Sequence, residues 1–436
     1  MEFSGPAAWK EARRKTAKLM EDVATENNLL KALKRVCANR GGPGVDGMTV
    51  HELPGHYRKH KLTIREQLLS GSYQPCTILR RSIPKAGGGT RDLGIPTVVD
   101  RLVQQALLQI LDPIFDPLFS ESSYGFRPGR SAHQAVLQAK SYIQEGYKWV
   151  VDLDLEKFFD RVHHDILISR VARRIGDKRI LQLIGRFLRA GVMVEGVTLA
   201  REEGTPQGGP LSPLLANILL DEWDKELESR GHRFCRYADD CNIYVRSERA
   251  GKRVMETARK FLENRLKLKV NESKSAVARP QERKILGLSF GSDRERKIRI
   301  APKSLERVKD KIRDLTSRMR GKSLEAVIQD LNRYLQGWIG YFRIAETPSV
   351  LAKLDKWIHR RLRCYLWKQG KHRSGRFQLM RNLGLPEDAA WQWAWTRSGP
   401  WRMALVLNHG GIPTAYLHSK GLLSLTMLYH QARKGT

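Results

Sequence analysis

The stretch Arg236-Tyr237-Ala238-Asp239-Asp240 places two adjacent carboxylates between runs of β-favouring residues, Phe234-Cys235 before it and Cys241-Asn242-Ile243-Tyr244-Val245 after it. Successive residues of a strand point to opposite faces, so only a turn brings both acids toward one spot. The pattern therefore predicts a tight β-hairpin with Asp239 and Asp240 at its tip. Two carboxylates held side by side repel each other, and a hard divalent cation such as Mg²⁺ or Mn²⁺ compensates them best. An isolated Asp-Asp pair is more often a solvated turn, so this one needs a further acid to indicate chemistry.

A second acidic stretch, residues 149–160, supplies that acid with the sequence Trp-Val-Val-Asp-Leu-Asp-Leu-Glu-Lys-Phe-Phe-Asp. Apolar and acidic residues alternate from Trp149 to Leu155, which predicts a strand with Asp152 and Asp154 on one face. Beside the hairpin, such a strand completes a cluster of three carboxylates. A cluster of this kind can hold two metal ions about 3.5–4 Å apart, the arrangement that polymerases and nucleases use for phosphoryl transfer.

Charge and composition indicate a polyanionic partner. The chain has 436 residues, 41% of them hydrophobic, and a formal net charge of +32. This excess of Lys and Arg favours nucleic acid over the alternative of an anionic membrane surface. No apolar run reaches the length of a membrane span, so no membrane partner is expected. The five cysteines are scattered without a CxxC pair, which argues against disulfides and zinc and favours a reducing, cytoplasmic location.

Hydrophobic periodicity predicts a mainly helical chain around these strands. Helices are expected over residues 9–37, 62–69, 100–115, 132–145, 164–190, 214–230 and 249–267. Two short strands with a triglycine turn predict a basic hairpin over residues 79–96. Three further helices, 303–319, 323–344 and 349–368, interleave Lys and Arg with aromatic residues, which favours a nucleic-acid surface over an ordinary solvated face.

Six ordered motifs together resemble the group II intron reverse transcriptases, the intron-encoded maturases. They are Gly44-Val45-Asp46-Gly47, the basic hairpin, the acidic strand before Phe158-Phe159, the loop Gly204-Thr205-Pro206-Gln207-Gly208-Gly209-Pro210-Leu211-Ser212-Pro213, the Tyr-Ala-Asp-Asp hairpin and Leu286-Gly287-Leu288-Ser289-Phe290. The resemblance implies an α+β right-hand polymerase: fingers and a palm with an antiparallel sheet, an α-helical thumb and a small C-terminal helical domain. The implied boundaries are 1–75 for an N-terminal extension, 76–300 for fingers and palm, 301–380 for the thumb or maturase domain and 381–436 for a DNA-binding domain.

The resemblance also implies roles at a catalytic centre. Asp154, Asp239 and Asp240 would hold two Mg²⁺ ions, or Mn²⁺ in their place, with the backbone carbonyl of Leu155 as an added ligand. Asp152 is the weaker candidate, because the family's metal aspartate lies four and five residues before two aromatics, which is the spacing of Asp154. The nucleotide-binding positions would be Lys85, Arg91, Phe159 as the steric gate against a ribose 2′-hydroxyl, Gln207 and Lys274. By periodicity alone Phe159 is an ordinary core aromatic, and Lys274 is equally a surface lysine.

The remaining implied positions concern nucleic acid. Leu286 and Gly287 resemble the primer grip, and the basic residues expected to bind nucleic acid are Arg360, Arg361, Arg363 and Lys368. The expected partners are dNTPs, an RNA template with a DNA primer, group II intron RNA and target DNA. The expected location is the bacterial cytoplasm, in association with the nucleoid.

One departure from the family pattern concerns the C-terminus. Many relatives end in a His-Asn-His endonuclease with paired cysteines, and this sequence instead resembles the compact bacterial class without that domain. Cleavage of a second DNA strand is therefore not expected. Two other functions remain open: a reverse transcriptase without an intron partner that serves DNA repair or defence, and a non-catalytic RNA-binding splicing cofactor. The three retained acids favour the enzyme over the cofactor.

Overall fold

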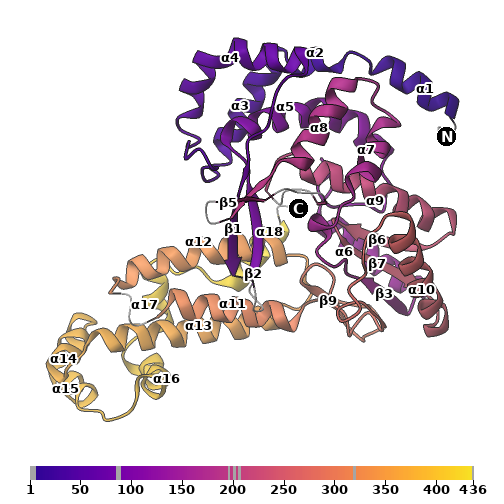
Figure 1. Cartoon of the computed structure of the whole chain (residues 1–436). Helices are drawn as coiled ribbons and strands as arrows, with labels where there is room; N and C mark the ends of the chain where they lie inside the picture. Colours follow the sequence, from indigo (N-terminus) through magenta and orange to yellow (C-terminus); the bar gives the residue numbers. More distant parts are fainter. Residues whose placement is uncertain are drawn as a thin grey trace. The chain divides into compact units, whose positions relative to one another are not determined.

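The computed structural model describes residues 6–84, 90–194, 197–199, 203–204, 208–317 and 321–434. The chain divides into two compact units, with the boundary between Arg283 and Lys284. Each unit has its own buried apolar core, and Figure 1 shows the elements of both.

The first unit contains a four-stranded antiparallel sheet with the strand order β6-β7-β3-β8. Val151 and Ile243 face each other across two of these strands and are fully buried. The acidic strand and the Tyr-Ala-Asp-Asp hairpin are therefore neighbours in one sheet, as the sequence predicted. The strands are β3 (Trp149–Leu153), β6 (Arg233–Tyr237), β7 (Asp240–Val245) and β8 (Ala276–Ala278). The helices that pack on them are α6 (Ala132–Gln144), α9 (Ser212–Ser229) and α10 (Glu248–Arg265) (Figure 1).

A second sheet of mixed strand direction has the order β2-β1-β4-β5. β1 (Ile78–Pro84) and β2 (Thr90–Ile95) form the antiparallel hairpin that the basic block predicted. β4 (Val192–Val194) runs parallel to β1 and pairs with β5 (Val197–Leu199). The glycine turn of the β1–β2 hairpin lies outside the described residues.

Helix α5 lies in the core of the first unit. Leu102, Val103 and Leu107 on α5 are fully buried, and the Thr97 side chain caps its start by accepting from the Asp100 amide. The helices are α1 (Pro6–Lys15), α2 (Leu19–Val23), α3 (Glu26–Ala38), α4 (Leu53–Ser70), α5 (Val98–Phe115), α7 (His164–Ala172) and α8 (Lys178–Arg189).

The N-terminal segment corrects one prediction. Residues 9–37 were expected to form one helix, whereas the structure has three helices in this region. Between α1 and α2 the Thr16 hydroxyl donates to Arg174 O (2.7 Å) and accepts from the Gly176 amide (2.9 Å). Between α2 and α3 the Thr25 side chain accepts from the Asn28 amide and begins a new helix. Long-range and capping hydrogen bonds thus interrupt a periodicity that is continuous in the sequence.

In the part of the chain that the structure describes, the second unit is helical apart from the antiparallel hairpin β9 (Leu288–Phe290) and β10 (Ile298–Ile300). The long helices α11 (Pro302–Leu315), α12 (Leu324–Phe342) and α13 (Pro348–Gln369) confirm the three helices predicted over residues 303–368 (Figure 1). Shorter helices follow: α14 (Arg373–Asn382), α15 (Glu387–Ala394), α16 (Pro400–Gly410), α17 (Thr414–Ser419) and α18 (Leu425–Lys434).

A buried carboxylate on α13 fixes α18 in place. Asp355 accepts from the amides of Leu425 (2.8 Å) and Thr426 (3.0 Å) and from the Thr426 hydroxyl (2.9 Å). The Tyr429 hydroxyl on α18 also donates to Ala345 O (2.8 Å). The first amides of α18 are thus satisfied by a residue about 70 positions earlier in the chain.

Candidate active site

The two adjacent acids lie at the turn between β6 and β7, where the sequence predicted them. Tyr237 pairs directly with Asp240, so Ala238 and Asp239 form a two-residue turn. Ala238 has a φ of +58°, a left-handed conformation that is unfavourable for a residue with a Cβ. Such a conformation persists only where the surrounding contacts enforce it.

Arg236 makes one of those contacts, to the Ala238 carbonyl, and is 1% exposed. Nε and Nη2 donate to the two carboxylate oxygens of Asp224 on α9, at 2.7 and 2.5 Å. Nη1 donates to Asn217 Oδ1 (3.0 Å) and Ala238 O (2.9 Å), and Nη2 also donates to Ser123 Oγ (2.8 Å). All five N–H groups of the guanidinium are therefore used. Burial alone lowers the pKa of Arg236, but the buried Asp224 carboxylate outweighs it and holds that pKa above its usual value.

A neighbouring segment supports the same turn through its backbone. The Tyr124 amide donates to Arg236 O, and the Arg236 amide donates to Ser122 O, both at 2.9 Å. Gly125 then passes so close to the turn that a Cβ there would lie 2.3 Å from the Ala238 amide nitrogen. Only glycine permits this approach, so residues 122–125 and the turn hold each other in position.

Asp154 lies at the end of β3, level with the turn. β3 pairs with β7 as far as Leu153, and continuing the same register places Asp154 opposite Asp240. The Asp154 amide donates to Ser275 Oγ (3.0 Å), and its carbonyl accepts from the Asn271 amide (2.8 Å). These bonds fix the backbone at the point where the strand presents its acid.

The Asp154 carboxylate is suited to bind a metal ion. Its Oδ2 atom is buried and has no hydrogen-bond partner among the described residues. Lys274 Nζ lies 3.1 Å from this oxygen, an ion pair that balances the charge without hydrogen-bond geometry. A buried carboxylate oxygen without a hydrogen bond is unfavourable, and hard oxygen donors of this kind are the ligands that Mg²⁺ prefers.

Asp152 shares the strand face with Asp154 but has a different partner. Arg283 holds Asp152 Oδ2 with Nε at 2.8 Å and Nη2 at 2.6 Å. The same guanidinium donates to Lys274 O (2.5 Å), so this ion pair also shapes the segment that carries Lys274. These contacts favour Asp154 over Asp152 as the metal ligand.

The three acids do not form a complete metal cage. Among the residues that the structure describes, no group of three or more His, Cys, Asp or Glu side chains is arranged to hold an ion. Asp239 and Asp240 have other interactions. Mg²⁺ commonly binds through one or two carboxylates together with substrate phosphates and water. The acids therefore fit an ion that is bound together with a nucleotide.

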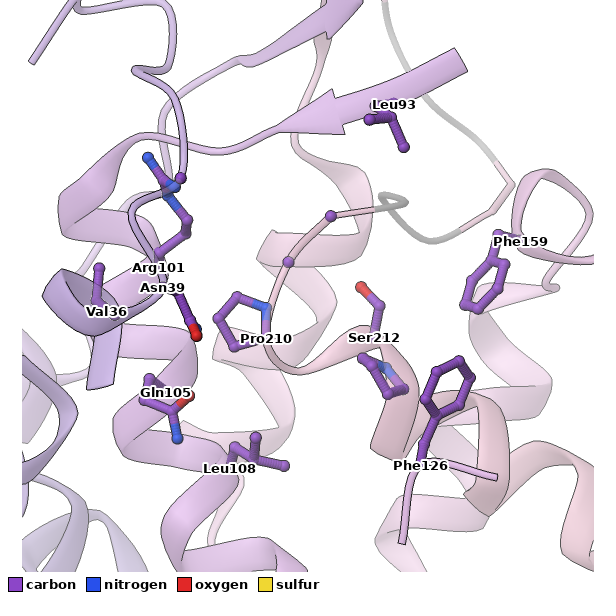
Figure 2. Close-up of a pocket in the computed structure, with 14 residues that line it drawn as sticks. Val36, Asn39, Leu93, Arg101, Gln105, Leu108, Phe126, Phe159, Pro210 and Ser212 are labelled. Carbon is purple, nitrogen blue, oxygen red and sulfur yellow. The ribbon is translucent and has the colours of Figure 1, made fainter. Parts of the chain in front are cut away.

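A cavity of about 610 Å³ opens beside Phe159 (Figure 2). Phe159 lies in the short helix η2 (Phe158–Asp160), where its buried ring packs edge to face on Phe158. Figure 2 shows Phe159 and Phe126 on one side of the cavity and Arg101, Asn39 and Gln105 on the other. The cavity has the size of pockets that bind small ligands. The proposed gate residue therefore borders a space that can hold a nucleotide.

The other predicted nucleotide-binding positions are placed only in part. Lys85 and Gln207 lie outside the described residues. Arg91 lies on β2, where its backbone pairs with Ile83. Leu155 is buried beyond the end of β3, in an isolated bridge with Val270.

In the second unit, Leu286 and Gly287 form a turn before β9. Their φ angles are +51° and +80°. Leu286 O accepts from the Tyr341 hydroxyl (2.7 Å), and Gly287 O accepts from the Ser304 hydroxyl (2.8 Å). Side chains of α11 and α12 thus fix this turn.

Arg363 lies in the interior of the second unit. It is 4% exposed, and its guanidinium donates to Ile412 O (2.7 Å) and Thr414 Oγ1 (2.8 Å). Burial lowers the pKa of Arg363. The side chain joins α13 to the segment that begins α17, so it does not contribute to an exposed basic surface.

The other three basic residues predicted on α13 are more accessible. Lys368 is exposed, and Arg361 is half-buried and donates to Thr316 Oγ1 (2.7 Å). The Arg360 guanidinium lies 3.9 Å from the centroid of the Trp401 ring. A basic and an aromatic side chain thus lie together at this surface.

The fold and the paired acids define a class of protein, an α+β right-hand polymerase whose palm sheet carries acids at the β6–β7 turn and at the end of β3. The family comparisons agree with this class. Residues 83–290 match the model of reverse transcriptase (RNA-dependent DNA polymerase), and residues 305–384 match the maturase-specific domain of group II introns. No helix in the described part of the chain is long and apolar enough to cross a bilayer.

Individual proteins are also similar to this chain. Protein YkfC of Escherichia coli (strain K12) is 34% identical over 300 residues, which cover 60% of this chain and 79% of YkfC. The group II intron-encoded protein LtrA of Lactococcus lactis subsp. cremoris is 38% identical over 195 residues, which cover 44% of this chain and 32% of LtrA. A solved structure titled a partial Cas6-RT-Cas1–Cas2 complex matches 56% of this chain and 42% of that chain at 26% identity, with a TM-score of 0.37.

The chain belongs to the family of group II intron-encoded reverse transcriptases and maturases. It is an RNA-directed DNA polymerase of a class that depends on a divalent metal, and its partners are nucleic acids.

Proposed function

We propose that this protein copies group II intron RNA into DNA from a DNA primer and also binds that RNA to assist its splicing and mobility. The observation that carries the proposal is the Asp154 carboxylate, whose buried Oδ2 lacks a hydrogen bond at the end of β3, level with the Asp239–Asp240 turn. A maturase-specific domain match in the same chain supports the RNA-binding role.

The acids hold the metal in this proposal. Asp154, Asp239 and Asp240, with the carbonyl of Leu155, would hold two Mg²⁺ ions, for which Mn²⁺ could substitute. Bound ions of this kind stabilise the negative charge that develops on a phosphate under attack. Lys274 balances the charge of Asp154 before the ions bind, as its 3.1 Å ion pair supports. In this proposal the same lysine donates a proton to the leaving pyrophosphate.

Four residues hold the incoming nucleotide in this proposal. Lys85 and Arg91 contact the triphosphate of the incoming dNTP, and Gln207 lines the nucleotide pocket. The Phe159 ring excludes a ribose 2′-hydroxyl, a role supported by its place at the edge of the cavity. A rigid, well-packed ring discriminates by size because it cannot move aside.

The second unit binds nucleic acid in this proposal. Leu286 and Gly287 contact the primer, and Arg360, Arg361 and Lys368 contact intron RNA. The C-terminal helices bind target DNA through exposed rings such as Trp395, which is 58% exposed and lies 4.0 Å from the Arg373 guanidinium. The proposed division is 1–75 extension, 76–300 fingers and palm, 301–380 thumb and 381–436 DNA-binding domain, acting in the cytoplasm on the nucleoid.

Primer extension on an RNA template with dNTPs and Mg²⁺ tests the proposal. Asp154→Asn and the double variant Asp239→Ala/Asp240→Ala should each lose at least about a thousandfold in rate, because several kcal/mol of charge stabilisation are removed. Asp152→Asn is the matched control on the same strand face, and it should retain extension within about tenfold because Arg283, not a metal, is its partner.

RNA binding distinguishes the proposed function from the splicing cofactor and from the reverse transcriptase without an intron partner. The variants without metal ligands should keep the wild-type affinity for RNA within about twofold, since the net charge of +32 lies elsewhere. A wild-type protein that binds RNA tightly and extends no primer would be a splicing cofactor rather than a polymerase. Extension that shows no preference for intron RNA would indicate a reverse transcriptase without an intron partner.

A further inference from the structure

Arg283 connects the acidic strand β3 to the segment that carries Lys274. Its Nε and Nη2 atoms lie 2.8 and 2.6 Å from Asp152 Oδ2, and Nη2 also donates to Lys274 O (2.5 Å). The Arg283 and Asp152 side chains are 29% and 18% exposed, so water and salt screen this ion pair only in part. One guanidinium therefore holds a carboxylate and a backbone carbonyl from two segments at the same time, which its planar fork allows.

The second of these segments, residues 271–275, is a turn beside Asp154. The Asn271 amide donates to Asp154 O (2.8 Å), and the Ser275 hydroxyl accepts from the Asp154 amide (3.0 Å). Within the turn, the amides of Lys274 and Ser275 donate to Asn271 O at 3.2 and 2.9 Å. This arrangement places Lys274 Nζ 3.1 Å from Asp154 Oδ2.

Packing alone does not fix the position of the Lys274 ammonium. The Lys274 side chain is 66% exposed, and the turn leads directly into β8, an edge strand of three residues. A short edge strand has few ladder hydrogen bonds and is weakly held. A cation bound to Asp154 would also repel the ammonium, so the backbone of the turn has to determine where Lys274 lies. Arg283 fixes that backbone at the Lys274 carbonyl.

We propose that Arg283, held by Asp152, is a positioning residue that keeps the Lys274 ammonium beside the catalytic acids. The inference rests on the proposed function, in which Lys274 donates a proton to the leaving pyrophosphate. Asp152, which shares a strand face with Asp154, then serves to orient Arg283. The competing role for Arg283 is to neutralise the charge of Asp152 next to the metal-binding acids. The two roles predict different activities for the same variants.

Steady-state primer extension distinguishes the two roles. Arg283→Lys keeps the positive charge but loses the planar fork, so kcat should fall about tenfold while KM for dNTP stays within about twofold. The neutral pair Arg283→Met/Asp152→Leu should be as slow, because neither new side chain can donate to Lys274 O. If Arg283 only neutralised Asp152, both variants would keep the wild-type kcat, and the proposal would be overturned.

Arg279→Lys is the matched control. Arg279 precedes Arg283 in the same segment, and it too donates to a backbone carbonyl, Lys148 O (3.4 Å). Its guanidinium lies 4.4 Å from the centroid of the Trp149 ring, at the opposite end of β3 from the catalytic acid. The same substitution there should leave kcat and KM within about twofold of the wild type.

A second variant tests the proposal if the Arg283 variants do not fold, which urea denaturation would show. Asp152→Asn keeps an acceptor oxygen for Arg283 and removes only the charge that orients it. The kcat of this variant should fall about three- to tenfold with KM for dNTP unchanged, the same pattern at smaller amplitude. An Asp152→Asn variant with the wild-type kcat would contradict the proposed role of Asp152.

A double-mutant cycle shows whether Arg283 acts through Lys274. Lys274→Ala removes the ammonium, so adding Arg283→Lys to it should slow kcat by less than about twofold further. Additive losses would mean that Arg283 acts on another group. A Lys274→Ala variant with the wild-type kcat would remove the group that Arg283 is proposed to position. Either result would overturn the inference.

Hydrogen exchange measures the turn without the reaction. The amides of Asn271 and Ser275 are hydrogen-bonded, and in Arg283→Lys they should exchange at least about tenfold faster than in the wild type, with no change in Arg279→Lys. Unchanged exchange in Arg283→Lys would show that Arg283 does not hold the turn. A wild type that extends no primer, with this difference in exchange present, would refute the proposed polymerase reaction and leave the contact between Arg283 and the turn established.

Discussion

The turn region and the cavity wall each contain a buried arginine, and the two differ in how the guanidinium is satisfied. Arg236 at the turn uses all five donors on protein acceptors, two of them oxygens of the fully buried Asp224. Within the described part of the chain, Arg101 at the cavity has one hydrogen bond, to Gly42 O. Burial alone therefore does not show whether a charged group is already satisfied within the fold. The occupancy of the donors does.

The largest difference between the two regions should be seen in the free energy of unfolding when Arg236 and Arg101 are each replaced by Met. Arg236→Met leaves Asp224 buried without a partner, so the free energy of unfolding should fall by about 3–5 kcal/mol. Urea denaturation measures this loss. The double variant Arg236→Met/Asp224→Leu should recover most of the stability but not primer extension, because the Ala238 carbonyl still lacks its donor. Full recovery of extension would show that Arg236 does not position the acidic turn.

A smaller effect concerns Asp221, a carboxylate on α9 close to the same ion pair. Burial raises the pKa of Asp221 to about 6 from 3.8. The folded state therefore holds this proton more tightly than the unfolded state. The resulting stabilisation is complete below about pH 4 and is lost as the pH rises through about 6, a decrease of roughly 2–3 kcal/mol. Denaturation at a series of pH values should show this slope, and Asp221→Asn should flatten it; an unchanged slope would contradict the assignment.

The smallest effect is expected at the cavity wall. Arg101→Met removes a buried charge that has no carboxylate partner among the described residues, so the free energy of unfolding should stay within about 0.5 kcal/mol of the wild type or rise. The same urea experiment measures it beside Arg236→Met. A loss as large as that of Arg236→Met would mean that Arg101 is structural, and the comparison between the two regions would fail.

The acidic hairpin could be predicted from sequence because all of its determinants are adjacent in the chain. The role of Arg236 could not, although it lies in the same stretch, since its partners come from α9 and from Ser123, 113 residues away. The choice between Asp152 and Asp154 depends in the same way on Arg283, 131 residues beyond Asp152. Alternation places both acids on one face, but only a distant partner shows which of them is already satisfied.

The cavity and the breaks between the N-terminal helices could not be predicted from the sequence. Arg101 has the periodicity of an ordinary helical residue, and nothing near it in the chain indicates that it is buried without a counter-ion. Thr16 likewise interrupts a helix through contacts with residues 174 and 176. Local patterns determine which elements form, whereas hydrogen bonds between distant segments decide where they end and which charges are left for ligands.

The cap that Asp355 provides for α18 also determines when the helices of the second unit can pack during synthesis. Its partners Leu425 and Thr426 are synthesised about 70 residues later, which at roughly 5–20 residues per second is a delay of several seconds. Until then α12 and α13 lack the helix that packs on both of them, and their apolar surface stays exposed on the nascent chain. The second unit therefore cannot cover this apolar surface until α18 has been synthesised, and until then the surface can bind chaperones or pair wrongly.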